Sequence, residues 1–134
     1  MNEAPVPSVL AMLVCENIII EAVTNKKTLV GVFNQIQNSQ FPAPFGPFWI
    51  YARLADAEGD YVLRLELVHL ETNKKILSAS GMDVHVPNRL GPHELSLNIQ
   101  RIFFELPGTY EVLLYANDVW IGRTTVSVVK KEQG

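Results

Sequence analysis

The sequence predicts an all-β protein, a single antiparallel β-sandwich of seven to nine strands that is immunoglobulin-like or related. Three observations predict this fold class. Several segments alternate apolar and polar residues with a period of two, as half-buried strands do. Glycine, proline and asparagine residues separate these segments, which is typical of sandwich corners. No stretch of ten or more residues shows helical periodicity.

Length and charge limit the domain organisation and the classes of partner. The 134 residues suffice for one domain with its own core. We expect a flexible N-terminal tail at 1–7, a sandwich domain at 8–130 and a C-terminal tail at 131–134. The net charge of −3 without a basic stripe argues against nucleic acid. The absence of a polybasic run or a long apolar segment argues against a membrane partner.

The single cysteine predicts a cytoplasmic protein, because Cys15 has no partner for an internal disulfide. Residues 8–15 superficially resemble a lipoprotein signal. However, Glu3 and no Lys or Arg precede them, and Val14 is not the small residue expected before the cysteine. Residues 9–15 instead predict a strand that is apolar on both faces, in which Cys15 is buried, inert packing.

The periodicity and the turn residues divide the chain into strands. Upstream of residue 107 they are predicted at 9–15, 18–23, 28–36, 48–56, 61–68, 76–86 and 94–104. Residues 37–47 contain three prolines, so we expect no regular strand pairing from Pro42 to Pro47. His69 follows a strand end and is expected at the surface.

Residues 107–128 predict the closing hairpin. Every second residue from Tyr110 to Ala116 is apolar and is assigned to the core face. The turn is placed at Asn117–Asp118, because both residue types tolerate positive φ. An extra residue near Gly122–Arg123 is needed to return the later valines to the core, since a β-bulge shifts side-chain parity by one. Three apolar residues then share the outer face: Leu113, Tyr115 and Trp120.

The hairpin and two earlier segments carry a family resemblance. The hairpin begins Pro107-Gly108-Thr109-Tyr110, an Ala-x-Leu-x-Cys-Glu strand lies at 11–16, and a Gly-containing apolar strand lies at 29–33. This chain resembles an uncharacterised family of small bacterial β-sandwich proteins, a domain of unknown function. It departs from the pattern at the turn, where Asp118-Val119 replaces Asp-Gly. The resemblance implies a β-sandwich and assigns no activity or site residues.

Four polar residues are the best candidates for acid–base chemistry or a metal site: Asp83, His85, His93 and Glu94. Asp83 and His85 are two apart on a strand, so they project from one face. Imidazole and carboxylate are suitable ligands for zinc or iron. Their spacing matches no motif with a known mechanism, and a solvated sheet face is the favoured interpretation. We therefore expect no cofactor, no metal and no catalytic residue.

The aromatic and proline-rich stretch at 41–49 is a candidate binding segment. Prolines lower the entropy lost on binding, and aromatic rings provide apolar anchors. Phe41, Phe45 and Trp49 are the ligand-binding candidates on this hypothesis. The alternative, which we favour, is that these aromatic residues cover one open end of the sandwich.

Three functional hypotheses remain open at this point. The leading one is a non-catalytic binding or interaction module, in which Leu113, Tyr115 and Trp120 are covered by a second subunit or a protein partner. The second is a small-ligand or metal-dependent enzyme that uses Asp83, His85, His93 and Glu94. The third is a structural subunit of a homo-oligomer.

Overall fold

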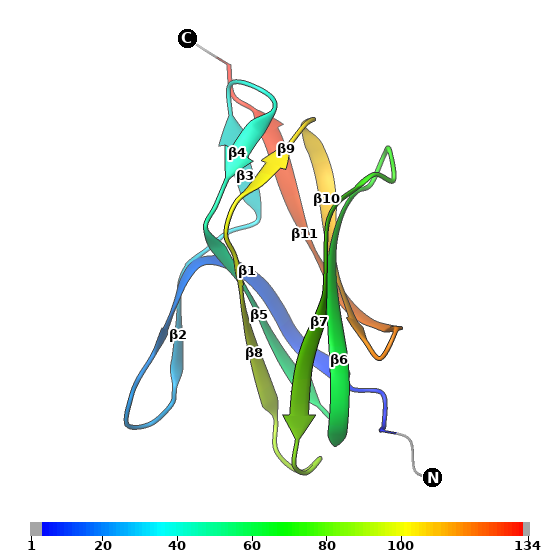
Figure 1. Ribbon diagram of the computed structural model, residues 1–134. Coiled ribbons are helices and arrows are strands. Elements are labelled where there is room, and N and C mark those ends of the chain that lie inside the picture. Colours follow the sequence, from blue (N-terminus) through cyan, green and yellow to red (C-terminus); the bar gives the residue numbers. More distant parts are fainter. Residues whose placement is uncertain (1–3, 133–134) are drawn as a thin grey trace.

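The computed structural model describes residues 4–132, which form two packed β layers (Figure 1). The described residues contain eleven strands and no helix. The strands are β1 (Ser8–Ile20), β2 (Lys27–Val32), β3 (Gln35–Asn38), β4 (Ala43–Phe45), β5 (Phe48–Ala55), β6 (Gly59–His69), β7 (Lys75–Val86), β8 (His93–Ile99), β9 (Ile102–Phe104), β10 (Gly108–Ala116) and β11 (Val119–Lys130). No segment of this part is a helix able to cross a bilayer.

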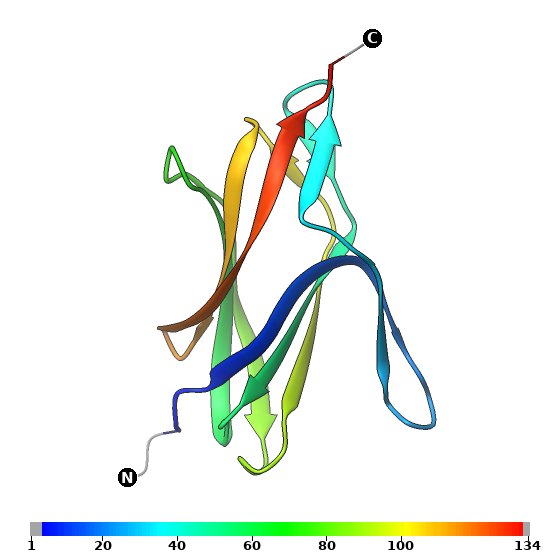
Figure 2. The ribbon, with the colours of Figure 1, turned by 180° about the vertical axis from the view of Figure 1, so that it is seen from behind.

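Two sheets and a short ribbon make up the layers. Sheet A has the order β2-β1-β5-β8, and sheet B has the order β3-β11-β10-β6-β7. All neighbours are antiparallel except β3, which pairs with β11 in parallel (Figure 2). The two-stranded β4–β9 ribbon extends the β5–β8 pair beyond a break. The all-β sandwich is therefore confirmed, with more strands than predicted.

Two additional strands arise where a predicted strand breaks. The chain leaves sheet A after Val32 and enters sheet B at Gln35, so the segment 28–36 becomes two strands. The segment 94–104 breaks beside Gly46, where an added Cβ would lie 2.3 Å from the carbonyl oxygen of Gln100. Core-facing residues on the two sides of each break are three positions apart, Phe33 and Ile36 at the first break and Ile99 and Ile102 at the second. A β-bulge gives the same shift, so the sequence pattern alone does not identify a break.

The prediction that residues 42–47 lack strand pairing is wrong for Ala43–Phe45. These residues form β4, in which Pro44 lies opposite Phe103 in a ribbon away from the sheet centres. A proline is tolerated there because its missing N–H can face the open edge of the ribbon. The aromatic rings do cover the core: Phe41 and Phe45 pack against it, and the Phe45 ring lies 5.4 Å from that of Phe48.

The closing hairpin has the predicted parity. The core face from Tyr110 to Ala116 is at most 2% exposed. Asn117 and Asp118 form the turn with φ of 49° and 64°. Leu114 is opposite Gly122, whereas Tyr115 is opposite Trp120, which leaves Ile121 as the extra residue of a bulge. The bulge restores later valines to the core.

A buried corner connects β9 in one layer to β10 in the other. The Tyr110 hydroxyl donates to the carbonyl of Leu106 at 2.6 Å, as in a tyrosine corner. His69 is only 3% exposed, so its expected surface position is wrong. Its Nε2–H donates to the carbonyl of Pro107 at 3.1 Å, and its Nδ1 accepts from the N–H of Thr72 at 3.2 Å. Pro107, Gly108 and Tyr110 surround His69, and strand periodicity does not predict these contacts.

The N-terminal segment that is described contacts the sandwich. The Tyr61 hydroxyl donates to the carbonyl of Pro5 at 2.6 Å, and Pro7 is buried. Residues 4–7 of the expected tail therefore pack on the fold. The remaining tail residues 1–3 and residues 133–134 lie outside the described part of the chain.

Gly108 is required at the corner, so we expect Gly108→Ala to destabilise the protein. Its φ is +138°, and an added Cβ would lie 2.6 Å from Nε2 of His69. The expected loss is about 1–3 kcal/mol in the free energy of unfolding, measured by urea denaturation. Gly91→Ala is the matched control, because nothing lies within 4 Å of its added Cβ. The control should change stability by less than ~0.5 kcal/mol. Equal effects of the two substitutions would contradict this account of the corner.

Candidate functional site

The four candidate metal ligands do not converge. Asp83 and His85 lie on β7 at the edge of sheet B, whereas His93 and Glu94 lie on β8 at the edge of sheet A. His85 instead pairs with Asp60, with 2.7 Å between Nδ1 and Oδ1. Among residues 4–132, no three His, Cys, Asp or Glu side chains are grouped to hold a metal ion. The structure thus gives the metal hypothesis no common site.

Glu94 belongs to a polar network on the outer face of sheet A. Its carboxylate accepts a short hydrogen bond from the hydroxyl of Tyr51, and it pairs with Nζ of Lys27 at 3.0 Å. The Tyr51 hydrogen bond, followed by Lys27, holds the pKa of Glu94 below its usual range despite an opposing effect of burial. Burial, followed by the interaction with Glu94, raises the pKa of Tyr51 to about 12.

Lys27 reaches Glu94 because the β1–β2 hairpin lies along the outer side of sheet A (Figure 1). We call the part of this hairpin from residue 17 to residue 30 the arm. Its Ile18 and Leu29 pack with Cys15 and Tyr51 in a small apolar cluster separate from the main core. The network and this cluster attach the arm to the sheet.

Cys15 is fully buried, as predicted. Its burial raises the pKa of the thiol. The expectation that the strand is apolar and covered on both faces is wrong for Leu10 and Leu13, which are 60% and 38% exposed. Both faces of β1 are covered only near Cys15, where the arm folds back.

The ligand-binding candidates lie on two different surfaces. Phe41 and Phe45 pack against the end of the main core, and Phe45 also contacts Phe33 with ring centroids 5.5 Å apart. Trp49 packs against the small cluster that includes Cys15. The three candidates therefore do not form one aromatic site.

Leu113, Tyr115 and Trp120 lie together on the outer face of sheet B, and we call them the hairpin patch. Tyr115 and Trp120 are opposite each other across the two strands, and Leu113 is two residues along β10. Trp120 is 54% exposed. Its Nε1–H donates to the carbonyl of Gly122 at 3.0 Å, so the donor of the exposed ring is already satisfied. The ring thus presents an apolar surface to solvent.

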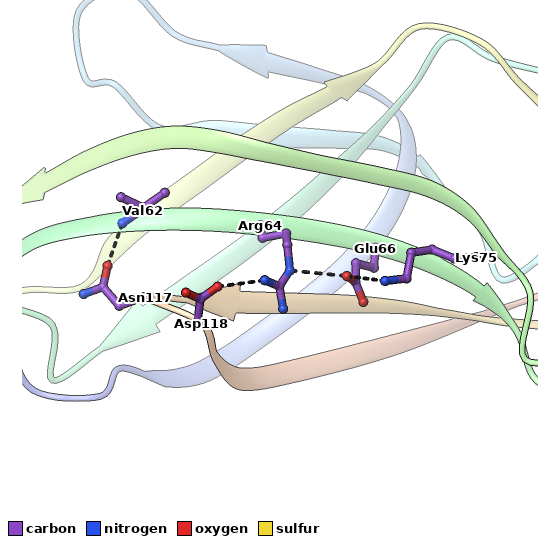
Figure 3. Close-up of polar contacts among 6 residues, drawn as sticks. All are labelled: Val62, Arg64, Glu66, Lys75, Asn117 and Asp118. Atoms are coloured by element: carbon purple, nitrogen blue, oxygen red, sulfur yellow. Dashed lines mark hydrogen bonds and ion pairs between the residues drawn. The ribbon is translucent and has the colours of Figure 1, made fainter.

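A chain of ion pairs joins Asp118, Arg64, Glu66 and Lys75 (Figure 3). Arg64 contacts Asp118 at 2.7 Å and Glu66 at 3.3 Å, and Lys75 contacts Glu66 at 2.9 Å. Glu66 is only 6% exposed, so these two cations compensate a largely buried carboxylate. The guanidinium carbon of Arg64 lies 4.1 Å from the ring centroid of Tyr115, within cation–π range.

Two further contacts fix the hairpin against its neighbours. Asn117 in the turn accepts the N–H of Val62 at 2.9 Å, which joins the turn to β6 (Figure 3). Arg123 pairs with Glu111 at 3.1 Å across β10 and β11.

Sequence reasoning found the patch from its alternation but missed Arg64 and Glu66. The sequence placed both residues on one face of the strand at 61–68. Their position next to the hairpin depends on β6 lying beside β10, which local alternation does not predict.

Comparison of the sequence with known protein families identifies the family of this chain. Residues 10–129 match the profile of a family of unknown function (DUF6941). The chain belongs to this family. No curated protein matches the sequence. Among solved structures, an immunoglobulin-like protein from Pseudomonas aeruginosa is similar at 10% sequence identity with a TM-score of 0.47, covering 92% of this chain and 96% of that chain.

The network of Glu94 predicts a pH dependence of stability. Because the folded-state pKa of Glu94 is lowered, its stabilising effect is present above the unfolded-state pKa and is lost as the pH falls through the folded-state value. The free energy of unfolding of the parent protein should therefore fall more steeply below about pH 4.5 than that of Glu94→Gln. Urea denaturation from pH 7 to pH 3 measures both slopes.

The exposed carboxylate of Glu71, in the turn between β6 and β7, provides the control for this pH experiment. Glu71→Gln should leave the slope of the parent protein unchanged. If Glu94→Gln retained that slope as well, the network would have no role in stability.

Proposed function

We propose that this chain is a non-catalytic protein-interaction module of the bacterial cytoplasm that forms a homodimer through the hairpin patch. The observation that carries the proposal is the exposure of Trp120 at 54% beside Tyr115 and Leu113. Tryptophan and tyrosine are favoured at the centres of protein interfaces. The single cysteine and the resemblance to small bacterial proteins support the compartment.

The state of the Trp120 ring supports binding of an apolar surface. The ring is held by its hydrogen bond to Gly122 and loses little conformational entropy when it is covered. Arg64 lies over Tyr115 and is fixed in turn by Asp118 and Glu66. A second protein that binds here therefore contacts an ordered apolar surface, and the polar groups beside that surface are already hydrogen-bonded or ion-paired.

The charges around the patch favour a second copy of this chain as the partner. The ion pairs contain three cations and three anions, so their formal charges cancel: Arg64, Lys75 and Arg123 with Glu66, Glu111 and Asp118. A two-fold axis places a surface against itself, and like charges would then oppose association. A locally neutral, internally paired surface avoids this repulsion, although the whole chain carries −3.

Trp120→Ala is the test of this function. As a residue central to the interface, Trp120 should contribute at least about 2 kcal/mol, so its loss should weaken dimerisation roughly thirtyfold. The free energy of monomer unfolding should change far less than the ~3–5 kcal/mol typical of a core tryptophan. Sedimentation velocity over a concentration series measures the dimer, and urea denaturation measures the monomer.

Leu90→Ala is the matched control, since Leu90 is an apolar residue that is 94% exposed and lies outside the patch. It should dimerise as the parent protein does. The proposal would be overturned by a parent protein that remains monomeric at millimolar concentration. Dimerisation that is unchanged in Trp120→Ala would overturn it as well.

A further inference from the structure

A groove lies where the two layers separate beside β3. Its volume is about 500 Å³, and its walls come from the chain crossing after β2, from β3 and from the segment between β4 and β5. The lining residues are Glu16, Phe33, Gln35, Ile36, Gln37, Phe45, Gly46 and Pro47. The floor is apolar because Ile36 is buried and Phe33 and Phe45 pack edge to face. Glu16 is the charged residue among those that line the groove.

The strand β3 is the outer strand of sheet B, so one of its edges has no neighbouring strand among the residues described. The carbonyls of Asn34 and Asn38 accept hydrogen bonds from the backbone N–H groups of Ser127 and Lys131. Backbone groups of successive strand residues point to opposite edges. The N–H and C=O groups of Gln35 and Gln37 therefore point to the open edge.

The facing strand β4 is blunted by proline. It pairs with β9 through three residues, and its central residue is Pro44. Proline has no N–H to donate, so the open edge of β4 offers no donor at its centre. Of the two strands that border the opening, β3 therefore offers the alternating donors and acceptors that an added strand requires.

We propose that this groove binds an extended peptide segment of a partner protein, which adds as a strand to the open edge of β3. Backbone hydrogen bonds to Gln35 and Gln37 provide the affinity, as in other cases of β-strand addition. An apolar side chain of the peptide packs against Phe33 and Phe45. A lysine or arginine of the peptide lies beside Glu16, because the carboxylate is the charged group in the lining.

A phage-displayed library of random nine-residue peptides provides the probe, and selected peptides are then measured by fluorescence polarisation. We expect enrichment of peptides that combine β-branched or aromatic residues with a lysine or arginine. Gln37→Pro removes an outward N–H and should weaken binding about five- to tenfold. Gln37→Ala, the matched control, keeps the N–H and should bind within about twofold. Glu16→Gln should lower affinity roughly two- to fivefold, for the basic peptides alone.

A scan of N-methylated peptides makes the test independent of how well the variants fold. N-methylation removes one peptide donor at a time, so losses should recur at every second position. The inference is overturned if no peptide is enriched, if N-methylation shows no alternation, or if Gln37→Ala weakens binding as much as Gln37→Pro. Trp120→Ala should bind the peptide normally. Loss of binding in that variant would assign the peptide to the hairpin patch and overturn the inference about the groove.

Discussion

The close contact between His69 and Gly108 constrains the whole architecture. At this corner the chain passes from the β9 ribbon to β10, which lies in the middle of sheet B between β11 and β6. The imidazole fills the space that a side chain at residue 108 would occupy, and Tyr110 packs edge-on against it with ring centroids 4.8 Å apart. The position of β10 sets the positions of the two strands beside it. The Pro-Gly-x-Tyr pattern at residues 107–110 is thus explained by packing, since Gly108 leaves room for the imidazole and the Tyr110 hydroxyl bonds back to the carbonyl of Leu106.

The sequence was sufficient for the fold class and for the parity of the hairpin, because both depend on local alternation. The bulge at Ile121 was predictable, because a two-residue turn without an extra residue would place Arg123 opposite Val112 on the core face. The breaks at Phe33 and at Gly46 were not predictable. There the core-facing positions shift by one residue, between Phe33 and Ile36 and between Ile99 and Ile102. Such a shift does not say whether the strand contains a bulge or ends.

The same distinction applies to the surfaces. Leu113, Tyr115 and Trp120 were placed correctly because they lie on two strands joined by a two-residue turn. The network of Lys27, Tyr51 and Glu94 joins residues separated by up to 67 positions, so no local pattern contains it. His85 and Glu94, which the sequence grouped as candidate ligands, belong to different sheets and have different partners. Proximity in sequence across a loop between two sheets was a poor guide to proximity in space.

The position of Cys15 beneath the arm gives this chain an internal reporter of local opening. The thiol is the only one in the sequence, and it is covered partly by side chains of the arm. Transient detachment of the arm would expose it without unfolding the sandwich. If closing is faster than alkylation, the observed alkylation rate equals the intrinsic rate of the free thiol multiplied by the equilibrium constant for opening. The free energy that holds the arm can therefore be obtained from one chemical reaction, separately from the stability of the rest of the fold.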